Sequence, residues 1–481
     1  MKQIKILKMA TIFLLLLACI FVFIVVRMVN DDSWQIEQEG MAFKGSIFHK
    51  YKGKIYAEVV GAGDREIKGA DADSFHEFKD DQYKSHVGVD KNAVYCANER
   101  TMLDPKALYY IGNNYYGDGK KSIFCSMFAR RDDKLSSFGL VLGYILYSFG
   151  IGDEPILYKN IVREISDTSI KPLLDLNLAT DGKNVYYEGE ILKDADPSKF
   201  RRIKDESGWR NSAFYMADGE HVYFKDKLLA IKDDPSLYQI ADFNDVYYLF
   251  DPKSGSVYAN DFEFDPKFRP FSLINQGREH TYHSLFRGKG GIYYYDDQSG
   301  QLYRAGDDPF SGSQKQITKN VFIDGKNLFY LESSEIRANS RSGGLTLKKR
   351  LTFIKRLPID DGITKLGDAD LEGSVWKSGD KIYYFDDLGT GQLVKNTIYE
   401  VTSPPDVQIL LHQTNIQTLR DLIGQGRLVP VNGEQILQAQ SVYDVGEIPI
   451  YVIFFAAFFI IMIGTMRKEP FGFARFKKYE K

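Results

Sequence analysis

The chain has 481 residues, and its formal net charge is −3. The first eight residues contribute +3 and the last fifteen contribute +4, which leaves −10 for the stretch between them. An acidic middle of this size argues against binding to nucleic acid or to anionic lipid through bulk charge. The 31 Tyr and 33 Phe, together with 41 Gly, indicate many short aromatic strands separated by turns, which is typical of an all-β protein with a sizeable core.

Two apolar segments lie near the ends of the chain, and we expect each to form a transmembrane α-helix, over residues 9–27 and 447–466. Each is long enough to cross a hydrocarbon core of roughly 30 Å. Lysine and arginine flank them at residues 1–8 and 467–481, and such residues are retained on the cytoplasmic side. The pattern predicts a membrane protein with both termini in the cytoplasm and the bulk of the chain extracytoplasmic. The lipid bilayer is then a partner of the two helices.

Alternatives remain at the first apolar segment and at a third one. The run Leu16–Cys19 is similar to the lipobox of a lipoprotein, but the apolar residues continue beyond Cys19, where a lipoprotein would show a polar tether. No small-residue cleavage site with a polar flank follows, which argues against a cleaved signal peptide. The third apolar stretch, Phe138 to Gly152, is short and interrupted by Gly and Ser. We expect it to pack on the domain or to lie on the membrane surface rather than to cross.

Between the two end segments, residues 28–404 are expected to form an extracytoplasmic all-β repeat domain with an insertion at 131–175. A short tyrosine phrase returns along it, and its clearest copy runs from Asp181 to Tyr187 as Asp-Gly-Lys-Asn-Val-Tyr-Tyr. The aliphatic residue of the phrase recurs at steps of 35 to 37 residues, a regularity typical of repeat architectures. These markers are Val185, Val222, Val257, Ile292 and Leu328.

The chemistry of the phrase accounts for its parts. Asp-Gly supplies the turn of a hairpin, and on the strand that follows, Val185 and Tyr187 point to one face and Tyr186 to the other. We expect neighbouring repeats to cover both faces, so that most of the tyrosines lie in the core. Three to four short strands in each repeat of roughly 36 residues favour a β-propeller-like ectodomain, with a β-solenoid or irregular sheet repeats as the alternative.

The pattern changes after Pro404 and Pro405. Apolar residues from Val407 to Ile423 recur at helical spacing, so residues 405–446 are expected to form a helical, membrane-proximal segment. A helix that packs under the repeats is favoured over a helix that binds a partner.

Cys96 and Cys125 are the two cysteines between the predicted membrane helices. In an oxidising compartment they could form a disulfide that closes a loop of about 30 residues, worth roughly 3 kcal/mol in the chain-entropy model. The alternative is a pair of unpaired buried thiols. No spacing of Cys and His resembles a zinc site.

No set of residues stands out as catalytic, cofactor-binding or metal-ligating, so we expect neither an enzyme nor a bound cofactor. His280 and His283 are three residues apart, which is not a zinc signature, and we expect exposed turn histidines. The Asp-rich turns match no EF-hand, and turn formation explains them without calcium. The sequence contains no serine-nucleophile motif and no phosphate-binding glycine loop.

Three runs carry a resemblance to a known family: Asp90–Tyr95 (Asp-Lys-Asn-Ala-Val-Tyr), Asp181–Tyr187, and Ala195–Phe200 (Ala-Asp-Pro-Ser-Lys-Phe). In these runs, and over about residues 50 to 265, the chain resembles the DKNYY family of bacterial envelope repeat proteins, which is named for the phrase. It departs from the family pattern at Cys96, where the second tyrosine would fall. Since the family is of uncharacterised function, the resemblance implies a bacterial envelope location and little chemistry. Together with the two predicted membrane helices, it implies a bacterial inner-membrane protein whose bulk is periplasmic.

Three functions are compatible with these features. The first is a non-catalytic binding or scaffold module of the bacterial envelope, whose partner is another protein or an envelope polymer and not nucleic acid. The second is an accessory or sensor subunit of a membrane complex. The third is a hydrolase of envelope polysaccharide or peptidoglycan, which would need paired carboxylates in a cleft. Repeat folds commonly expose a broad binding surface, which favours the first.

Overall fold

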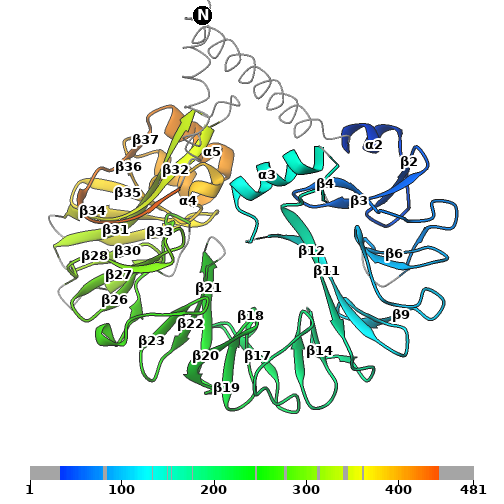
Figure 1. The fold of residues 1–481 in the computed structure, drawn as a ribbon. Coiled ribbons are helices and arrows are strands. Elements are labelled where there is room, and N and C mark those ends of the chain that lie inside the picture. The colour runs from blue at the N-terminus through cyan, green and yellow to red at the C-terminus, as the bar shows by residue number, and fades with distance from the viewer. Residues whose placement is uncertain are drawn as a thin grey trace, which may run out of the picture. The chain divides into compact units, whose positions relative to one another are not determined.

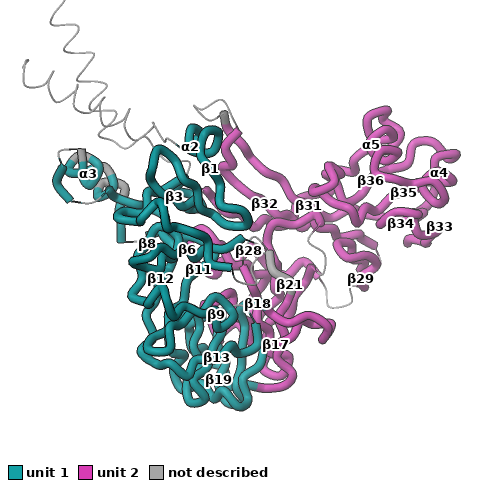
Figure 2. The backbone as a smooth tube through the Cα atoms, turned by 90° about the vertical axis from the view of Figure 1, so that its right-hand side faces the viewer, with its two compact units in different colours: residues 1–202, 213–233, 461–481 teal, residues 203–212, 234–460 magenta. Residues whose placement is uncertain are grey.

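The computed structural model describes residues 33–443, with short gaps. The gaps are at residues 80–83, 133, 149, 153, 176, 244–245, 276–278, 311–314, 325, 340–344 and 360–361. The chain divides into two compact units, which Figure 2 colours separately. In the described part, unit 1 consists of residues 33–202 and 213–233, and unit 2 consists of residues 203–212 and 234–443.

Both units are built from small antiparallel sheets (Figure 1). The described residues form nine sheets of four or five strands each, and apart from β38 the strands of a sheet follow one another in chain order. Consecutive strands are short and are joined by turns rich in Asp, Asn and Gly, so each strand folds back beside the one before it. This arrangement repeats along the chain, as the recurring phrase predicts.

Unit 1 contains four complete sheets. The first two are formed by β1 (Met41–Ala42), β2 (Phe48–Tyr51), β3 (Lys54–Val59) and β4 (Gly63–Glu66), and by β5 (His76–Glu77), β6 (Val87–Val89), β7 (Val94–Cys96) and β8 (Glu99–Arg100). The next two are formed by β9 (Tyr109–Gly112), β10 (Tyr115–Gly117), β11 (Ser122–Arg131) and β12 (Tyr158–Ile165), and by β13 (Lys171–Pro172), β14 (Leu178–Thr180), β15 (Val185–Tyr187) and β16 (Glu190–Ile191). Helix α2 (Ser33–Glu39) precedes β1, and α3 (Ser137–Ser148) separates β11 from β12 in the chain.

The boundary between the units runs through a fifth sheet. Its strands are β17 (Arg201–Lys204), β18 (Asn211–Ala217), β19 (His221–Phe224) and β20 (Lys227–Lys232).

Unit 2 contains four further sheets and two α-helices among the residues described. The first two sheets are formed by β21 (Tyr238–Phe243), β22 (Val246–Asp251), β23 (Ser256–Ala259) and β24 (Phe262–Glu263), and by β25 (Ser272–Leu273), β26 (Phe286–Gly288), β27 (Gly291–Asp296) and β28 (Gln301–Gly306). The third is formed by β29 (Lys315–Thr318), β30 (Val321–Ile323), β31 (Asn327–Asn339), β32 (Leu345–Pro358) and β38 (Glu434–Val442). The fourth is formed by β33 (Thr364–Asp368), β34 (Gly373–Ser378), β35 (Lys381–Asp386), β36 (Ile398–Val401) and β37 (Leu428–Pro430). The helices are α4 (Asp406–His412) and α5 (Ile416–Gly424), with short 3₁₀ turns at Pro266–Phe268 and Thr390–Gln392.

The predicted transmembrane helices, over residues 9–27 and 447–466, lie outside the described residues. Among the residues that the structure does describe, no helix is long and apolar enough to span a membrane. The four α-helices there have 7, 12, 7 and 9 residues, whereas a crossing takes about 20. We therefore correct the fold class to an all-β array of small antiparallel sheets with short helices. The flanking membrane helices and an inner-membrane location with two spans are not supported, and a β-propeller is not confirmed.

The segment expected to be helical after Pro405 contains both helices and strands. Helices α4 and α5 are separated by a break at Asn415, whose side chain accepts a hydrogen bond from the Thr418 N–H and begins α5. The inward-facing leucines of the two helices pack with aromatic residues of the sheet β33–β37. These leucines are Leu410, Leu419 and Leu422. Strands β37 and β38 follow, and β38 pairs with β32 as the fifth strand of its sheet.

Aromatic side chains fill the spaces between neighbouring sheets. Val185 and Tyr187 of β15 lie in one buried cluster and Tyr186 lies in another, which confirms that the strand is covered on both faces. The tyrosines of the phrase are therefore core residues, as their fixed place in the repeat predicts.

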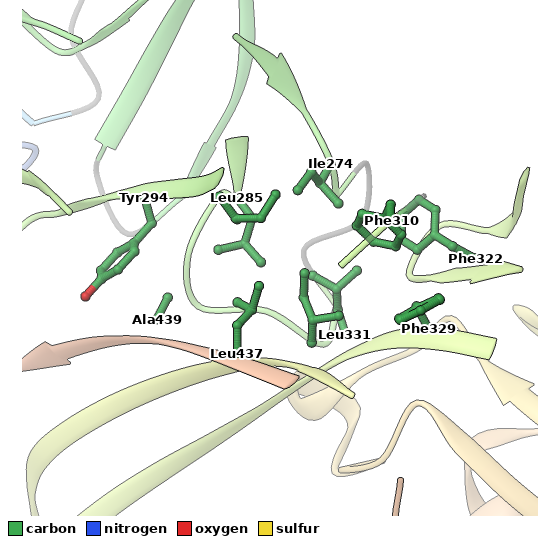
Figure 3. Packing of buried hydrophobic residues seen from close by; sticks show 11 residues of the cluster. Ile274, Leu285, Tyr294, Phe310, Phe322, Phe329, Leu331, Leu437 and Ala439 are labelled. Atoms are coloured by element: carbon green, nitrogen blue, oxygen red, sulfur yellow. The ribbon is translucent and has the colours of Figure 1, made fainter. Parts of the chain in front are cut away.

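A similar cluster lies in unit 2 between β27 and β38. Figure 3 shows Tyr294 and Leu285 on one side of this cluster and Leu437 and Ala439 on the other. All four side chains are buried. Burial of such apolar area, at about 25 cal/mol per Å², is the main force that holds the sheets together.

Candidate functional site

The repeated phrase forms a hairpin turn that its aspartate closes. In the clearest copy, between β14 and β15, Asp181 Oδ1 accepts hydrogen bonds from the backbone N–H groups of Lys183 at 2.7 Å and Asn184 at 2.6 Å. Its Oδ2 accepts from the Asn184 side chain at 2.7 Å and from the Tyr186 hydroxyl at 2.9 Å. Gly182 has φ +89°, a left-handed conformation that favours glycine. One carboxylate therefore holds the turn and the first tyrosine of the phrase together.

Asp90, Asp118 and Asp218 have the same role in their hairpins. One oxygen of each accepts the backbone N–H groups two and three residues ahead, as seen for Asp90, Asp118 and Asp218. The other oxygen accepts a backbone N–H from the connection that leads into the same sheet. The Asp71 N–H donates to Asp90 at 2.7 Å. The Asp104 N–H donates to Asp118 and the Asp196 N–H donates to Asp218, each at 3.0 Å. The turn aspartate thus joins the middle hairpin of a sheet to its entry.

These hydrogen bonds keep the turn carboxylates ionised. Burial alone would raise their pKa, but the backbone N–H donors outweigh burial and lower the pKa of Asp90, Asp118 and Asp218. The pKa of Asp181 falls to about 2, again with burial opposing the shift and the N–H groups of Asn184 favouring the charged form. The lone pairs that a cation would need are thus engaged by N–H and O–H donors. In the described part of the chain, no group of His, Cys, Asp and Glu is arranged to hold a metal ion.

A cleft opens beside the hairpin turn at two places in unit 1. Cleft A, of about 870 Å³, lies between the turn at residues 180–184 and the connection at residues 191–198. Cleft B, of about 400 Å³, lies between the turn at residues 92–93 and the connection at residues 100–105. The next hairpin turn also borders cleft B, through Asp118, Lys120 and Lys121.

The two clefts occupy equivalent places in the repeat. The connection is joined to the phrase by the same backbone hydrogen bond, from Leu192 to Val185 in cleft A and from Thr101 to Val94 in cleft B, each 2.8 Å long. An Asp-Pro pair follows in both connections, at residues 196–197 and 104–105. Cleft B belongs to the second sheet and cleft A to the fourth, and equivalent clefts in different repeats are a surface that a repeat fold offers to an extended ligand.

The linings offer hydrogen bonds and apolar contact rather than a reactive group. Cleft A is lined by Ile191, which is 57% exposed, together with Lys183, Asn184 and Ser198. The Ser198 hydroxyl donates to Asp196 Oδ1 at 2.6 Å, and this hydrogen bond helps to lower the pKa of that carboxyl. Neither lining includes a histidine or a cysteine. Such clefts present polar groups and an exposed apolar side chain to a bound chain.

Cys96 and Cys125, the residues considered for a disulfide, lie together in unit 1. Cys96 on β7 and Cys125 on β11 have sulfur atoms 2.06 Å apart, and both side chains are buried. The bond joins the second sheet to the third across a sequence separation of 29 residues. Neither cysteine lines cleft A or cleft B, so the disulfide holds neighbouring repeats together and does not contact the clefts.

His280 and His283 were expected on an exposed turn, and this expectation is wrong. They are 0% and 4% exposed and lie inside unit 2. His280 Nε2 lies 2.9 Å from Asp386 Oδ2, and His283 Nε2 lies 3.0 Å from Ser441 Oγ. These partners are 106 and 158 residues away in the sequence, so no local spacing could have revealed them.

The comparisons with known proteins concern the part of the chain that holds both clefts. No curated protein matches the chain. The model of the DKNYY family matches residues 48–227, from the start of β2 to the start of β20. This match confirms the resemblance that the repeated phrase carries. Residues 48–227 of the chain are therefore similar to the DKNYY family.

Proposed function

We propose that this protein is a non-catalytic binding module that holds an extended partner, either a protein segment or a polymer chain, along equivalent clefts of its repeats. The observation that carries the proposal is the equivalence of cleft A and cleft B, which have the same hydrogen-bonded frame and the same Asp-Pro border. A surface that recurs with the repeat suits a ligand whose own groups recur.

Two clefts on one chain also allow weak sites to act together. Once one cleft is filled, a partner that spans both meets the second at a high effective concentration, so the combined affinity exceeds that of either site. Each cleft then needs to supply only modest binding energy, which agrees with the mixed polar and apolar linings.

We infer a non-catalytic module because hydrogen bonds hold the turn aspartates in their ionised form. The turn aspartates accept two or more hydrogen bonds each, and their pKa is lowered rather than raised. A carboxylic acid that donates a proton to a glycosidic bond needs the opposite shift. These aspartates therefore suit a structural role better than acid–base catalysis.

The test is a binding panel on the full-length chain. Wild-type protein is passed over immobilised polysaccharide chains and a library of short random peptides, and the retained fraction is measured for each. Ile191→Glu places a charge in cleft A, and Arg100→Glu reverses one in cleft B. Leu228→Glu, at a 38% exposed position of β20 outside both clefts, is the matched control.

We expect the wild type and Leu228→Glu to retain the same probes, and each cleft variant to lose at least half of the retained fraction. Retention that is equal in all four proteins, or no retained probe for the wild type, contradicts the proposal. Release of cleavage products from a polysaccharide probe would contradict its non-catalytic part.

A further inference from the structure

A short polar segment, residues 279–283, runs through the inside of unit 2 and contacts three of its sheets. His280, Thr281 and His283 are all less than 5% exposed. His280 reaches Asp386 at the end of β35, and His283 reaches β32 and β38. Ser441 of β38 is hydrogen-bonded both to His283 and to Asp296, which lies at the end of β27. One buried segment is thus tied by side chains to the sheets β25–β28, β29–β32 with β38, and β33–β37.

The hydrogen bonds of His283 fit its neutral ring only. Thr352 Oγ1 already accepts the N–H groups of Tyr282 at 2.8 Å and His283 at 3.2 Å, so it donates its own hydrogen to His283 Nδ1 at 2.9 Å. The proton of the ring is then on Nε2 and is donated to Ser441 Oγ at 3.0 Å. Ser441 in turn donates to Asp296 Oδ1 at 2.5 Å. A second ring proton on Nδ1 would face a hydroxyl that has no lone pair to spare.

His280 is fixed by a different partner. Asp386 accepts its Nε2–H together with the Tyr384 hydroxyl at 3.1 Å and the N–H groups of Leu388 at 3.1 Å and Gly389 at 2.8 Å. The Nδ1 atom of His280 is buried and has no hydrogen-bond partner. His280 therefore anchors one end of the segment, and His283 is the end whose bonding depends on its protonation.

Charged and titratable groups face the segment from every element packed against it. They are Glu279 on the segment, Lys319 after β29, Glu372 before β34, Tyr294, Asp296 and Asp297 of β27 and its turn, Glu335 and Arg337 of β31, Arg350 of β32, Asp386 and Asp387 of β35 and its turn, and Tyr443 after β38. Burial lowers the pKa of His283 to about 4, with Asp296 opposing the shift and Arg350 adding to it.

We propose that residues 279–283 form an acid-sensitive connection, which joins three sheets of unit 2 while His283 is neutral and opens when His283 is protonated. The device is independent of cleft A and cleft B, since both lie in unit 1. An open segment has an ordinary histidine pKa of about 6.5, whereas the closed segment has a pKa of about 4. The open form therefore binds more protons between these values, so closure is favoured above pH 6.5 and is weakened as pH falls towards 4.

The test is hydrogen exchange on the full-length chain, measured by mass spectrometry at pH 7 and pH 5 and corrected for the intrinsic exchange rates. The amides of Tyr282 and His283 are expected to lose roughly 20-fold in protection between the two pH values, the factor that the two pKa values imply. His283→Gln keeps a neutral side chain and should remove this pH dependence. His412→Gln, at an exposed histidine of α4, should leave it unchanged.

A wild-type chain whose protection at these amides is the same at both pH values overturns the proposal, and so does a His283→Gln chain that keeps the full pH dependence. If His283→Gln does not fold, the wild type decides alone, through exchange of the ring C–H of its histidines followed against pH. That titration should give a pKa for His283 well below 6.5, and a value at or above 6.5 overturns the proposal.

Discussion

At the scale of single residues, the aspartate in the turn of the phrase forms hydrogen bonds with two separate parts of the chain. Its role in the hairpin could be predicted, because Asp followed by Gly or by Lys-Asn is typical of a tight turn. Its second role, which is to bind the connection that leads into the same sheet, could not be predicted. The oxygen that binds the entry to the same sheet accepts from Asp71, Asp104 or Asp196, which lie 14 to 22 residues before their acceptors. Bonds over that separation depend on how the sheets are stacked, which no local pattern records.

Replacing Asp181 tests this role. In Asp181→Asn an amide group must face the Asn184 side chain and the Tyr186 hydroxyl, which donate to the carboxylate in the wild type. We expect a loss of about 1–3 kcal/mol in the free energy of unfolding, measured by urea denaturation. Asp73→Asn, at a side chain that is 98% exposed, is the control and should change little. Equal midpoints for wild type and Asp181→Asn would contradict the role.

The same substitution predicts a pH effect. The pKa of Asp181 is lowered to about 2 in the folded chain, against 3.8 ordinarily, so its charged form stabilises the fold above pH 3.8. That contribution is lost as the pH falls towards 2. The difference in stability between wild type and Asp181→Asn should therefore narrow over this range, and a difference that stays constant would show that charge is not involved.

At the scale of elements, the sequence predicted the strands of the repeats more successfully than it predicted the helices in the segments near the ends of the chain. The alternation of Val185, Tyr186 and Tyr187 predicted a strand covered on both faces, because side chains on a strand point alternately to opposite sides. The apolar spacing from Val407 to Ile423 predicted helical structure but not the break at Asn415, where a side-chain cap begins a second helix. Apolar length alone also predicted membrane helices, which the described residues do not support.

The disulfide between β7 and β11 carries a prediction at this scale. Cys96→Ser with Cys125→Ser should lower the free energy of unfolding by roughly 3 kcal/mol, because the bond restricts a loop of sequence separation 29 in the unfolded chain. The wild type treated with a thiol reductant should unfold at the same urea concentration as the double variant. If the double variant and the untreated wild type unfold together, the bond contributes nothing to stability.

At the scale of the whole molecule, the repeat was visible in the sequence and the binding surface was not. The steps between Val185 and Leu328 gave the length of the repeat, and the DKNYY match covers residues 48–227. The clefts lie where a turn meets a connection, so they depend on the packing of successive elements. Some lining residues, such as Asn184 and Ser198, belong to the repeated runs, but these runs do not indicate that a turn and a connection enclose a cleft. The burial of His280 and His283 could not be predicted for the same reason, since their partners come from strands distant in the sequence.

The most direct test of the central claim is the dependence of affinity on ligand length. The polysaccharide or peptide that the binding panel identifies is prepared as a series of increasing length, and its dissociation constant is measured for the full-length wild type, Ile191→Glu, Arg100→Glu and the double variant. If an extended partner fills both clefts, the wild-type affinity rises steeply once the ligand is long enough to reach the second cleft, and each single variant abolishes that rise. An affinity that does not change with length, or a rise that persists in the double variant, would contradict the account.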